Sequence, residues 1–253
     1  MSDTYNVDIK VLLESGAHFG HKTSRRHPKM APFIHSKRGE NHIIDLTKTV
    51  DQLEKNLPFI EQTVAQGRQV LFVGTKRQAQ DIIKETATSL GQPYVTERWL
   101  GGMLTNTNTM NIQVKKLKDL EAKMASGELA SKYNKLEVQR FQEQIDDMNK
   151  KFGGIKDMNG RPGVLFVVDI VKEDNAIKEA KKLGIPVVAL VDTNADPSLV
   201  THPVACNDDA IKAIIVVCDY VKEAVTRGQS AVAKKADKAE KTAESKKEEV
   251  KKD

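Results

Sequence analysis

The sequence predicts an α/β protein, with a parallel sheet of about five strands, helices on both faces, and an inserted pair of antiparallel helices. Two patterns carry this prediction. Short continuous apolar runs such as QVLFVGT (69–75) and GVLFVVDI (163–170) are typical of strands covered on both faces, and they alternate with helical periodicity. Between these runs, the segment 107–152 has apolar residues at alternating spacings of three and four, which favours a coiled-coil hairpin.

Periodicity and turn residues divide the first hundred residues into alternating helices and strands. Thr47 is a favoured helix N-cap residue, and Gly67 and Gly91 follow apolar-periodic stretches as stop signals. The expected elements are a helix over 7–16, a strand over 42–46, a helix over 47–66, a strand over 69–75, a helix over 76–90 and a strand over 93–97.

The same alternation resumes after the glycine pair at 153 and 154. The expected elements are a strand over 163–170, a helix over 172–183, a strand over 186–192, a brief apolar step over 203–206 and a helix from Asp208 to about Thr226. The stretch 229–253 is almost wholly Ala, Lys, Glu, Asp, Ser and Thr. It offers too little apolar surface to offset the entropy of ordering, so we expect a disordered tail there.

The nine residues RWLGGMLTN (98–106) separate the two kinds of sequence, and we interpret them as a hinge. We expect Trp99 and Leu100 to anchor the root of the insertion while Gly101 and Gly102 allow a tight turn. Gly127 is the expected turn between the two helical arms. The predicted organisation is a discontinuous globular domain (1–106 and 153–228), a hairpin (107–152) and the tail (229–253).

Charge favours an acidic partner such as nucleic acid. The 253 residues have a formal net charge of +5, and the pI is about 9.0. The segment 18–40 concentrates basic residues with Glu40 as its one acid, and we expect an ordered loop with a positive face. Two cysteines in no metal-ligand spacing argue against a disulfide framework, and no apolar run reaches membrane-spanning length, so we expect a cytoplasmic protein.

The ends of the predicted strands suggest two candidate ligand sites. Lys76 and Arg77 lie where a strand meets a helix, a place that suits phosphate, although VGTKRQAQ lacks the complete glycine patterns of nucleotide-binding loops. Asp192 ends a strand, and Asp208 and Asp209 begin the last helix, so their oxygens could hold a divalent ion or merely cap and turn the chain. Five histidines between 18 and 42 show no zinc-ligand spacing.

Several motifs together resemble the bacterial small-subunit ribosomal protein 2 family, over residues 7 to about 228. They are GAHFGHKTSRRHPKMAPFI, HIIDLTKTV, VLFVGTKRQA, RWLGGMLTN, GGIKDM, LGIPVVALVDTNADP and NDDAIKAI, in this order. The resemblance implies a Rossmann-like (flavodoxin-like) sheet domain with a coiled-coil hairpin, and a non-catalytic, ribosome-bound component of the small subunit. It implies contact with 16S rRNA between head and body, with neighbouring small-subunit proteins, and with small-subunit ribosomal protein 1 for capture of mRNA.

Carried onto this chain, the resemblance makes thirteen residues RNA-contact candidates. These are Lys22, Arg25, Arg26, Lys29, Lys37, Arg38, Lys76, Arg77, Arg98, Asn106, Lys115, Lys116 and Lys118. It also favours a structural divalent metal at Asp192, Asp208 and Asp209, with no required cofactor, small-molecule substrate or membrane. The alternative hypothesis is an α/β enzyme that acts on a phosphorylated or nucleotide substrate at the strand ends.

The chain departs from the family pattern in two places. Arg26 and His27 stand where members commonly have Trp-Asn, and Thr107 stands where an aromatic commonly follows Leu-Thr-Asn. Each change removes an aromatic side chain. We therefore expect Trp99 to be the main anchor of the hairpin root.

Overall fold

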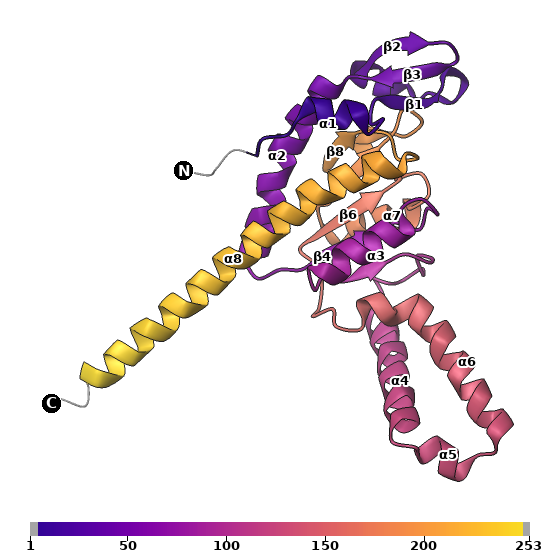
Figure 1. Ribbon diagram of the computed structural model, residues 1–253, viewed down its shortest axis with the longest axis vertical. Helices are drawn as coiled ribbons and strands as arrows, with labels where there is room; N and C mark the ends of the chain where they lie inside the picture. The colour runs from indigo at the N-terminus through magenta and orange to yellow at the C-terminus, as the bar shows by residue number, and fades with distance from the viewer. Residues whose placement is uncertain (1–4, 250–253) are drawn as a thin grey trace.

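The computed structural model describes the backbone of residues 5–249 and the side chains of residues 5–234. It contains a five-stranded sheet layered between helices, a small three-stranded sheet at one end, and two long helical projections (Figure 1). One projection is the inserted hairpin, and the other is the last helix. No helix within 5–249 is long and apolar enough to cross a membrane.

The large sheet is parallel throughout, and its strand order is β5-β4-β6-β7-β8. The strands are β4 (Val70–Val73), β5 (Tyr94–Val95), β6 (Val164–Val168), β7 (Val187–Val191) and β8 (His202–Ala205). The chain starts in β4, steps outward to β5 and then crosses to β6, which is the flavodoxin-like order. The predicted five-stranded α/β fold is confirmed, and its switch point lies between the ends of β4 and β6.

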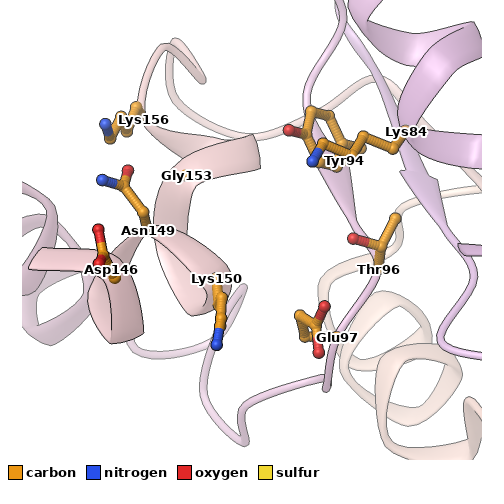
Figure 2. Close-up of a pocket in the computed structure, with 9 residues that line it drawn as sticks. All are labelled: Lys84, Tyr94, Thr96, Glu97, Asp146, Asn149, Lys150, Gly153 and Lys156. Carbon is orange, nitrogen blue, oxygen red and sulfur yellow. The ribbon is translucent and has the colours of Figure 1, made fainter. Parts of the chain in front are cut away.

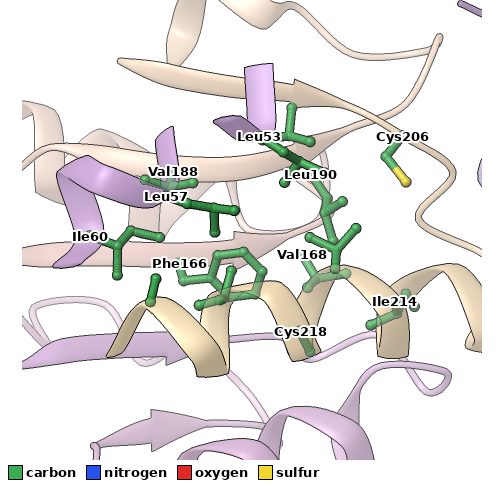
Figure 3. Close-up of a cluster of buried hydrophobic side chains, with 14 of the residues drawn as sticks. Leu53, Leu57, Ile60, Phe166, Val168, Val188, Leu190, Cys206, Ile214 and Cys218 are labelled. Atoms are coloured by element: carbon green, nitrogen blue, oxygen red, sulfur yellow. The ribbon is translucent and has the colours of Figure 1, made fainter. Parts of the chain in front are cut away.

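One face of this sheet is covered by α2 (Leu46–Ala65), α3 (Gln80–Ser89) and α8 (Ile211–Glu249). Figure 3 shows Leu57 and Ile60 from α2 beside Phe166 of the sheet, with Ile214 from α8 farther along the same cluster, near Val168. Helices α2 and α8 approach so closely at Gly228 that a Cβ there would lie 2.7 Å from the Glu61 carbonyl oxygen. A side chain at this position would push the two helices apart.

The opposite face is covered by α7 (Asp174–Leu183) and by the root of the hairpin. Met103 and Leu104 are buried there, next to residues of the inserted helices. At the far edge of the sheet, polar side chains of α2 satisfy the backbone of β8. Thr49 Oγ1 donates to the Ala205 carbonyl at 2.6 Å, and the Ala205 N–H donates to Gln52 Oε1 at 2.7 Å.

The basic segment 18–40 is largely a sheet, where the sequence predicted a loop. Strands β1 (Phe19–Lys22), β2 (Ile34–Arg38) and β3 (Asn41–Ile44) pair antiparallel in the order β1-β3-β2. Short α1 (Ile9–Glu14) precedes this small sheet, and the 3-10 turns η1 (Thr23–Arg25) and η2 (Pro28–Phe33) lie between β1 and β2. Alternating apolar residues are nearly absent from β1 and β2, so their pairing depends on β3 and not on a periodic pattern.

Several predicted helix starts were displaced, three of them for a local reason that the structure shows. Asp45 caps α2 by accepting from the Thr47 N–H at 3.1 Å, so Thr47 lies inside the helix. Helix α3 begins at Gln80 because residues 76–79 form a turn. Asn207 Oδ1 accepts from the N–H groups of Asp209 and Ala210 before α8, which frees the Asp208 carboxylate from capping.

The insertion consists of α4 (Thr107–Ala125), α5 (Glu128–Lys132) and α6 (Lys135–Phe152), followed by η3 (Gly153–Ile155). Helices α4 and α6 pack against each other near the root, where Leu117, Ile145 and Met148 are buried (Figure 1). Gly127 adopts a left-handed φ of 74°, as its place in the expected turn requires, but the connection continues through α5 to a capping box at Asn134 and Glu137. That the pair packs as a coiled coil stays a prediction.

Helix α8 continues to Glu249, so the predicted end at about 226 was wrong, while the predicted disorder of the tail stays a prediction. Ala, Lys and Glu are strong helix formers, and extending an existing helix avoids the cost of nucleation. Residues 250–253 of the predicted tail lie outside the described residues.

Candidate functional site

Charged side chains from four parts of the chain meet at the carboxyl edge of the large sheet. Lys76 follows β4, Asp192 follows β7, Asp208 and Asp209 follow β8, and His21 comes down from β1 of the small sheet. We call these five residues the strand-end cluster. His21 and the three aspartates offer ligand atoms that all lie within 4.8 Å of one another.

Lys76 is the cation at the centre of the cluster. Its Nζ lies 2.7 Å from Asp208 Oδ1, 2.6 Å from Asp209 Oδ1 and 3.5 Å from Asp169 Oδ2. The Lys76 side chain is only 14% exposed and that of Asp208 only 2%. Lys76 is therefore ion-paired within the protein and is not available to bind an external phosphate.

His21 joins the small sheet to the large one. Its Nδ1 lies 2.9 Å from Asp192 Oδ2 and its Nε2 lies 3.4 Å from Asp209 Oδ2. The His21 N–H also donates to Thr193 Oγ1 at 2.9 Å. The neighbouring Gly20 has no room for a side chain, because a Cβ would lie 2.6 Å from Thr193 Cγ2. The backbone of β1 thus packs directly against the loop that follows β7.

Three residues of the strand-end cluster have shifted pKa values. Burial, together with the charges of Asp169 and Asp192, raises the pKa of Asp208 to about 7 in spite of Lys76. The hydrogen bond to Asp192 raises the pKa of His21, against the effect of burial. Burial alone would lower the pKa of Lys76, but the Asp208 charge and the hydrogen bonds to Asp208 and Asp209 hold it above its usual value. The cluster is therefore short of positive charge when Asp208 is ionised.

The donor set fits a divalent metal. An imidazole and three carboxylates are ligands that transition-metal ions accept, and a metal would offset the charge that makes Asp208 retain its proton. The sequence prediction placed Asp192, Asp208 and Asp209 together, and the structure does bring them together. It missed His21, which lies 171 residues from Asp192 along the chain, and no local pattern joins the two.

The turn after β4 is closed to phosphate by the protein's own carboxylate. The Thr75 N–H donates to Glu173 Oε1 at 3.0 Å and the Thr75 hydroxyl donates to the same oxygen, while Lys172 Nζ donates to the Thr75 carbonyl at 2.8 Å. Glu173 is buried, and burial raises its pKa. Since a nucleotide phosphate would need the same N–H, this geometry argues against the enzyme alternative.

Some basic residues of 18–40 are exposed to solvent, and others contact acidic or polar side chains of the protein. Arg25, Arg26, Lys37 and Arg38 are exposed on the small sheet and the turns beside it. Lys22 lies 3.2 Å from Glu40 Oε2. Lys29 Nζ donates to Asp196 Oδ2 at 2.8 Å and to Ser198 Oγ at 2.6 Å, so Lys29 ties η2 to η4 (Pro197–Leu199).

The two departures from the family pattern have local consequences. His27 Nδ1 accepts from the Lys29 N–H at 3.3 Å and so caps η2, while Arg26 is exposed. Thr107 is half-buried at the first turn of α4, where no side chain caps the helix.

The hairpin root is fixed by a residue that the sequence analysis did not single out. Glu179 of α7 accepts hydrogen bonds from Trp99 Nε1, from the N–H groups of Gly102, Leu104 and Thr105, and from the Thr105 hydroxyl. Trp99 is 6% exposed, as its expected anchoring role requires, and Gly102 has a left-handed φ of 89°.

The remaining RNA-contact candidates lie on the surface near the root and along α4. Arg77 follows β4, and Arg98 and Asn106 flank the hinge. Lys115 and Lys116 are exposed on α4, whereas Lys118 Nζ lies 3.1 Å from Asp157 Oδ1. The candidates therefore form two surfaces: the small-sheet surface (Arg25, Arg26, Lys37 and Arg38) and the hairpin surface (Arg98, Asn106, Lys115 and Lys116).

The fold is that of an α/β protein in which a layered parallel sheet with a closed nucleotide position carries a charged small sheet and a projecting helical hairpin. The model of the family described as "Ribosomal protein S2" matches residues 12–228. The chain belongs to this family, whose members are structural proteins of the small ribosomal subunit and not enzymes.

Relatives from several bacteria are similar to this chain over most of their length. The chain is 52% identical over 224 residues to the small ribosomal subunit protein uS2 of Roseiflexus sp. (strain RS-1), covering 88% of this chain and 85% of the relative. It is 48% identical over 223 residues to that of Coprothermobacter proteolyticus (88% and 83%). It is 46% identical over 220 residues to that of Rhodospirillum rubrum (87% and 84%).

Proposed function

We propose that this protein binds 16S rRNA between the head and the body of the small subunit, in the cytoplasm, beside neighbouring small-subunit proteins. The observation that carries the proposal is the pair of basic surfaces at opposite ends of the large sheet, on the small sheet and on the hairpin (Figure 1). Two separated surfaces on one protein suit a role in joining two parts of a folded RNA.

Binding proceeds by neutralisation of phosphates and by shape. Arginine and lysine side chains release counterions from the RNA backbone, and the deep major groove of RNA helices leaves little access to base edges. Arg25, Arg26 and Arg38 carry this role on the small sheet, and Lys115 and Lys116 carry it on α4. Lys76, which three carboxylates engage, is left out of the contact set.

We also propose that the globular domain helps dock small-subunit ribosomal protein 1, which captures mRNA. An apolar groove of about 310 Å³ between α1 and the small sheet supports this role, with Ile9, Leu13 and Ile43 in its lining. Ile9 and Leu13 are large apolar side chains that are 42% and 54% exposed. A binding partner would remove this apolar surface from water.

The strand-end cluster supports a structural role for a divalent metal. His21, Asp192, Asp208 and Asp209 would hold it, and when bound it supplies positive charge where three carboxylates meet. Because His21 belongs to the small sheet, a metal held by this set would join the small sheet more firmly to the large one.

Sedimentation tests the proposal. A tagged chain should migrate with small subunits at low salt and remain with them at moderate salt. A chain that stays in the soluble fraction at both salt concentrations would overturn it. Binding of purified protein 1 to subunits that carry the chain, compared with subunits that carry an Ile9→Asp/Leu13→Asp variant, tests the groove separately.

A further inference from the structure

A cleft of about 670 Å³ opens between the hairpin and the globular domain. Tyr94, Thr96 and Glu97 line it on the side of β5, and Asn149, Lys150 and Gly153 line it on the side of α6. Figure 2 shows these two groups facing each other across open space, with the Tyr94 hydroxyl directed into it. The volume lies within the range of pockets that hold a nucleotide-sized ligand.

Two amino groups stand at the rim of the cleft. Lys84 of α3 and Lys150 of α6 are exposed, and within the described part of the chain neither has an ion-pair partner among the acidic side chains. Lys156, the third lysine of the lining, lies 2.6 Å from Glu121 Oε1 and is already engaged. Lys84 and Lys150 are therefore available to an anion such as a phosphate group.

The interior offers a fixed aromatic ring and hydrogen-bond acceptors. Gly154 lies against Tyr94 so closely that a Cβ there would be 2.7 Å from Tyr94 Cδ2 and 2.2 Å from its carbonyl oxygen, so the glycine backbone holds the ring in place. The exposed Glu97 carboxylate can only accept hydrogen bonds when ionised. Guanine is the base whose pairing edge presents adjacent N–H donors, at N1 and at the exocyclic amine, which match a carboxylate.

We propose that this cleft binds one unpaired nucleotide of the small-subunit rRNA, with guanine as its base. The phosphate lies between Lys84 and Lys150, the base packs beside the Tyr94 ring, and Glu97 accepts from the base edge. Proteins recognise unstacked bases of loops and bulges in this manner, by aromatic contact and by hydrogen bonds to the pairing edge. The inference rests on the proposed rRNA binding and deepens it, because it adds a base-specific contact to phosphate neutralisation.

Chemical probing of assembled subunits tests the inference. Subunits that lack the chain are supplemented with wild type, Tyr94→Leu, Glu97→Gln or a Lys182→Gln/Lys212→Gln control, whose two lysines are exposed on α7 and α8. A carbodiimide that modifies unpaired guanine N1 is the probe. We expect one guanine to be protected by the wild type and by the control, and to become at least about fivefold more reactive with Tyr94→Leu or Glu97→Gln.

The outcomes separate the inference from the proposed function. If the wild type enters subunits and no guanine changes between it and the two cleft variants, the cleft proposal is wrong while rRNA binding stands. If the wild type does not enter subunits, both fail. Thermal melting of each purified variant, together with its incorporation into subunits, identifies a misfolded chain. Tyr94→Phe keeps the aromatic ring, so this variant should keep the protection.

Discussion

The Trp99 indole donates a hydrogen bond from Nε1 to Glu179 Oε1 at 3.1 Å. The same carboxylate accepts from Gly102 N at 2.7 Å and from Leu104 N and Thr105 N at 3.0 Å. One side chain of α7 thus accepts from three backbone N–H groups of the turn from which the hairpin departs. We therefore expect Glu179 to hold the root of the hairpin against α7.

Glu179→Gln should loosen the hairpin while the sheet stays folded. An amide presents one acceptor oxygen and an NH₂ group that opposes the backbone N–H donors, and hydrogen bonds to a charged group contribute roughly 1.5 to 3 kcal/mol each. We expect faster hydrogen exchange over 98–152 and unchanged exchange in β6 and β7. Asp174→Asn, on the same helix, is the control and should leave both regions unchanged.

The hydrogen bonds to Glu179 predict that the stability of the hairpin root depends on pH. Burial alone would raise the pKa of Glu179, but the hydrogen bonds from Trp99, Gly102, Leu104 and Thr105 outweigh it and lower the pKa. A lowered pKa means that the carboxylate stabilises the fold above the ordinary range of glutamate and that this stability is lost as the pH falls through the lowered value. Exchange over 98–106 should therefore rise in acid before the sheet opens, and simultaneous opening of both would contradict this order.

Trp99→Ala should affect the hairpin more than the domain. It removes a buried ring and the donor to Glu179, whereas Trp99→Phe removes only the donor and part of the volume. Loss of exchange protection should therefore follow the order wild type, Trp99→Phe, Trp99→Ala over 107–152. Equal loss of protection in the hairpin and in the large sheet for Trp99→Ala would disprove the anchoring role.

Lys76→Met should destabilise the globular domain, and more strongly at high pH. The variant leaves Asp208, Asp209 and Asp169 without their common cation, which costs about 3 kcal/mol for a buried pair that loses one partner. Because the pKa of Asp208 is raised to about 7, the folded state retains a proton below that pH and stability falls as the pH rises toward it. Without Lys76 this decline should extend to higher pH.

Urea denaturation at pH 5.5 and pH 8.5 measures the effect. The difference in the free energy of unfolding between wild type and Lys76→Met should be larger at pH 8.5. Lys84→Met, in which an exposed lysine is replaced, is the control. A difference that is the same at both pH values would show that Asp208 is not linked to Lys76.

A divalent metal should stabilise the protein by binding the strand-end cluster. Bound Zn²⁺ requires neutral His21 and ionised Asp208, so the increase in Tm should be larger at pH 8 than at pH 6, and binding should release protons. Asp192→Asn should abolish the effect and Asp51→Asn, on exposed α2 surface, should not. Elemental analysis of dialysed wild type that finds well below one equivalent would rule the site out.

Strands β4, β6 and β7 of the large sheet were predictable because each is a continuous apolar run between turn residues. Residues 164–168 and 187–191 are buried without exception, and such runs leave little ambiguity about sheet position. The small sheet was not predictable in the same way, since β1 and β2 are mostly exposed and carry basic residues. Its strands pair through β3, and contacts with the loop after β7 hold it on the large sheet, such as the hydrogen bond from the His27 N–H to the Thr193 carbonyl at 2.8 Å.

The candidate site was predictable only in part, for a related reason. Acids that follow neighbouring parallel strands must meet at one edge, so Asp192 and Asp208 could be placed together from strand order alone. His21 and Glu179 reach their partners across 171 and 80 residues, and neither sits in a local pattern that marks such a contact. Lys76 looked like a phosphate ligand in the sequence because its three carboxylate partners come from elsewhere in the fold.

Replacement of Arg25, Arg26 and Arg38 by alanine should weaken binding to 16S fragments and flatten its dependence on salt. Each lost phosphate contact lowers the slope of log K against log salt by roughly 0.7 to 0.9, so three contacts should lower it by about 2 to 3. Lys29 is kept, because it holds Asp196 and Ser198 and its loss would perturb η4. The control replaces Lys181, Lys182 and Lys212, which removes the same charge from α7 and α8. If the control flattens the slope equally, overall charge and not the small-sheet surface governs binding, because only a localised contact distinguishes two variants of identical net charge.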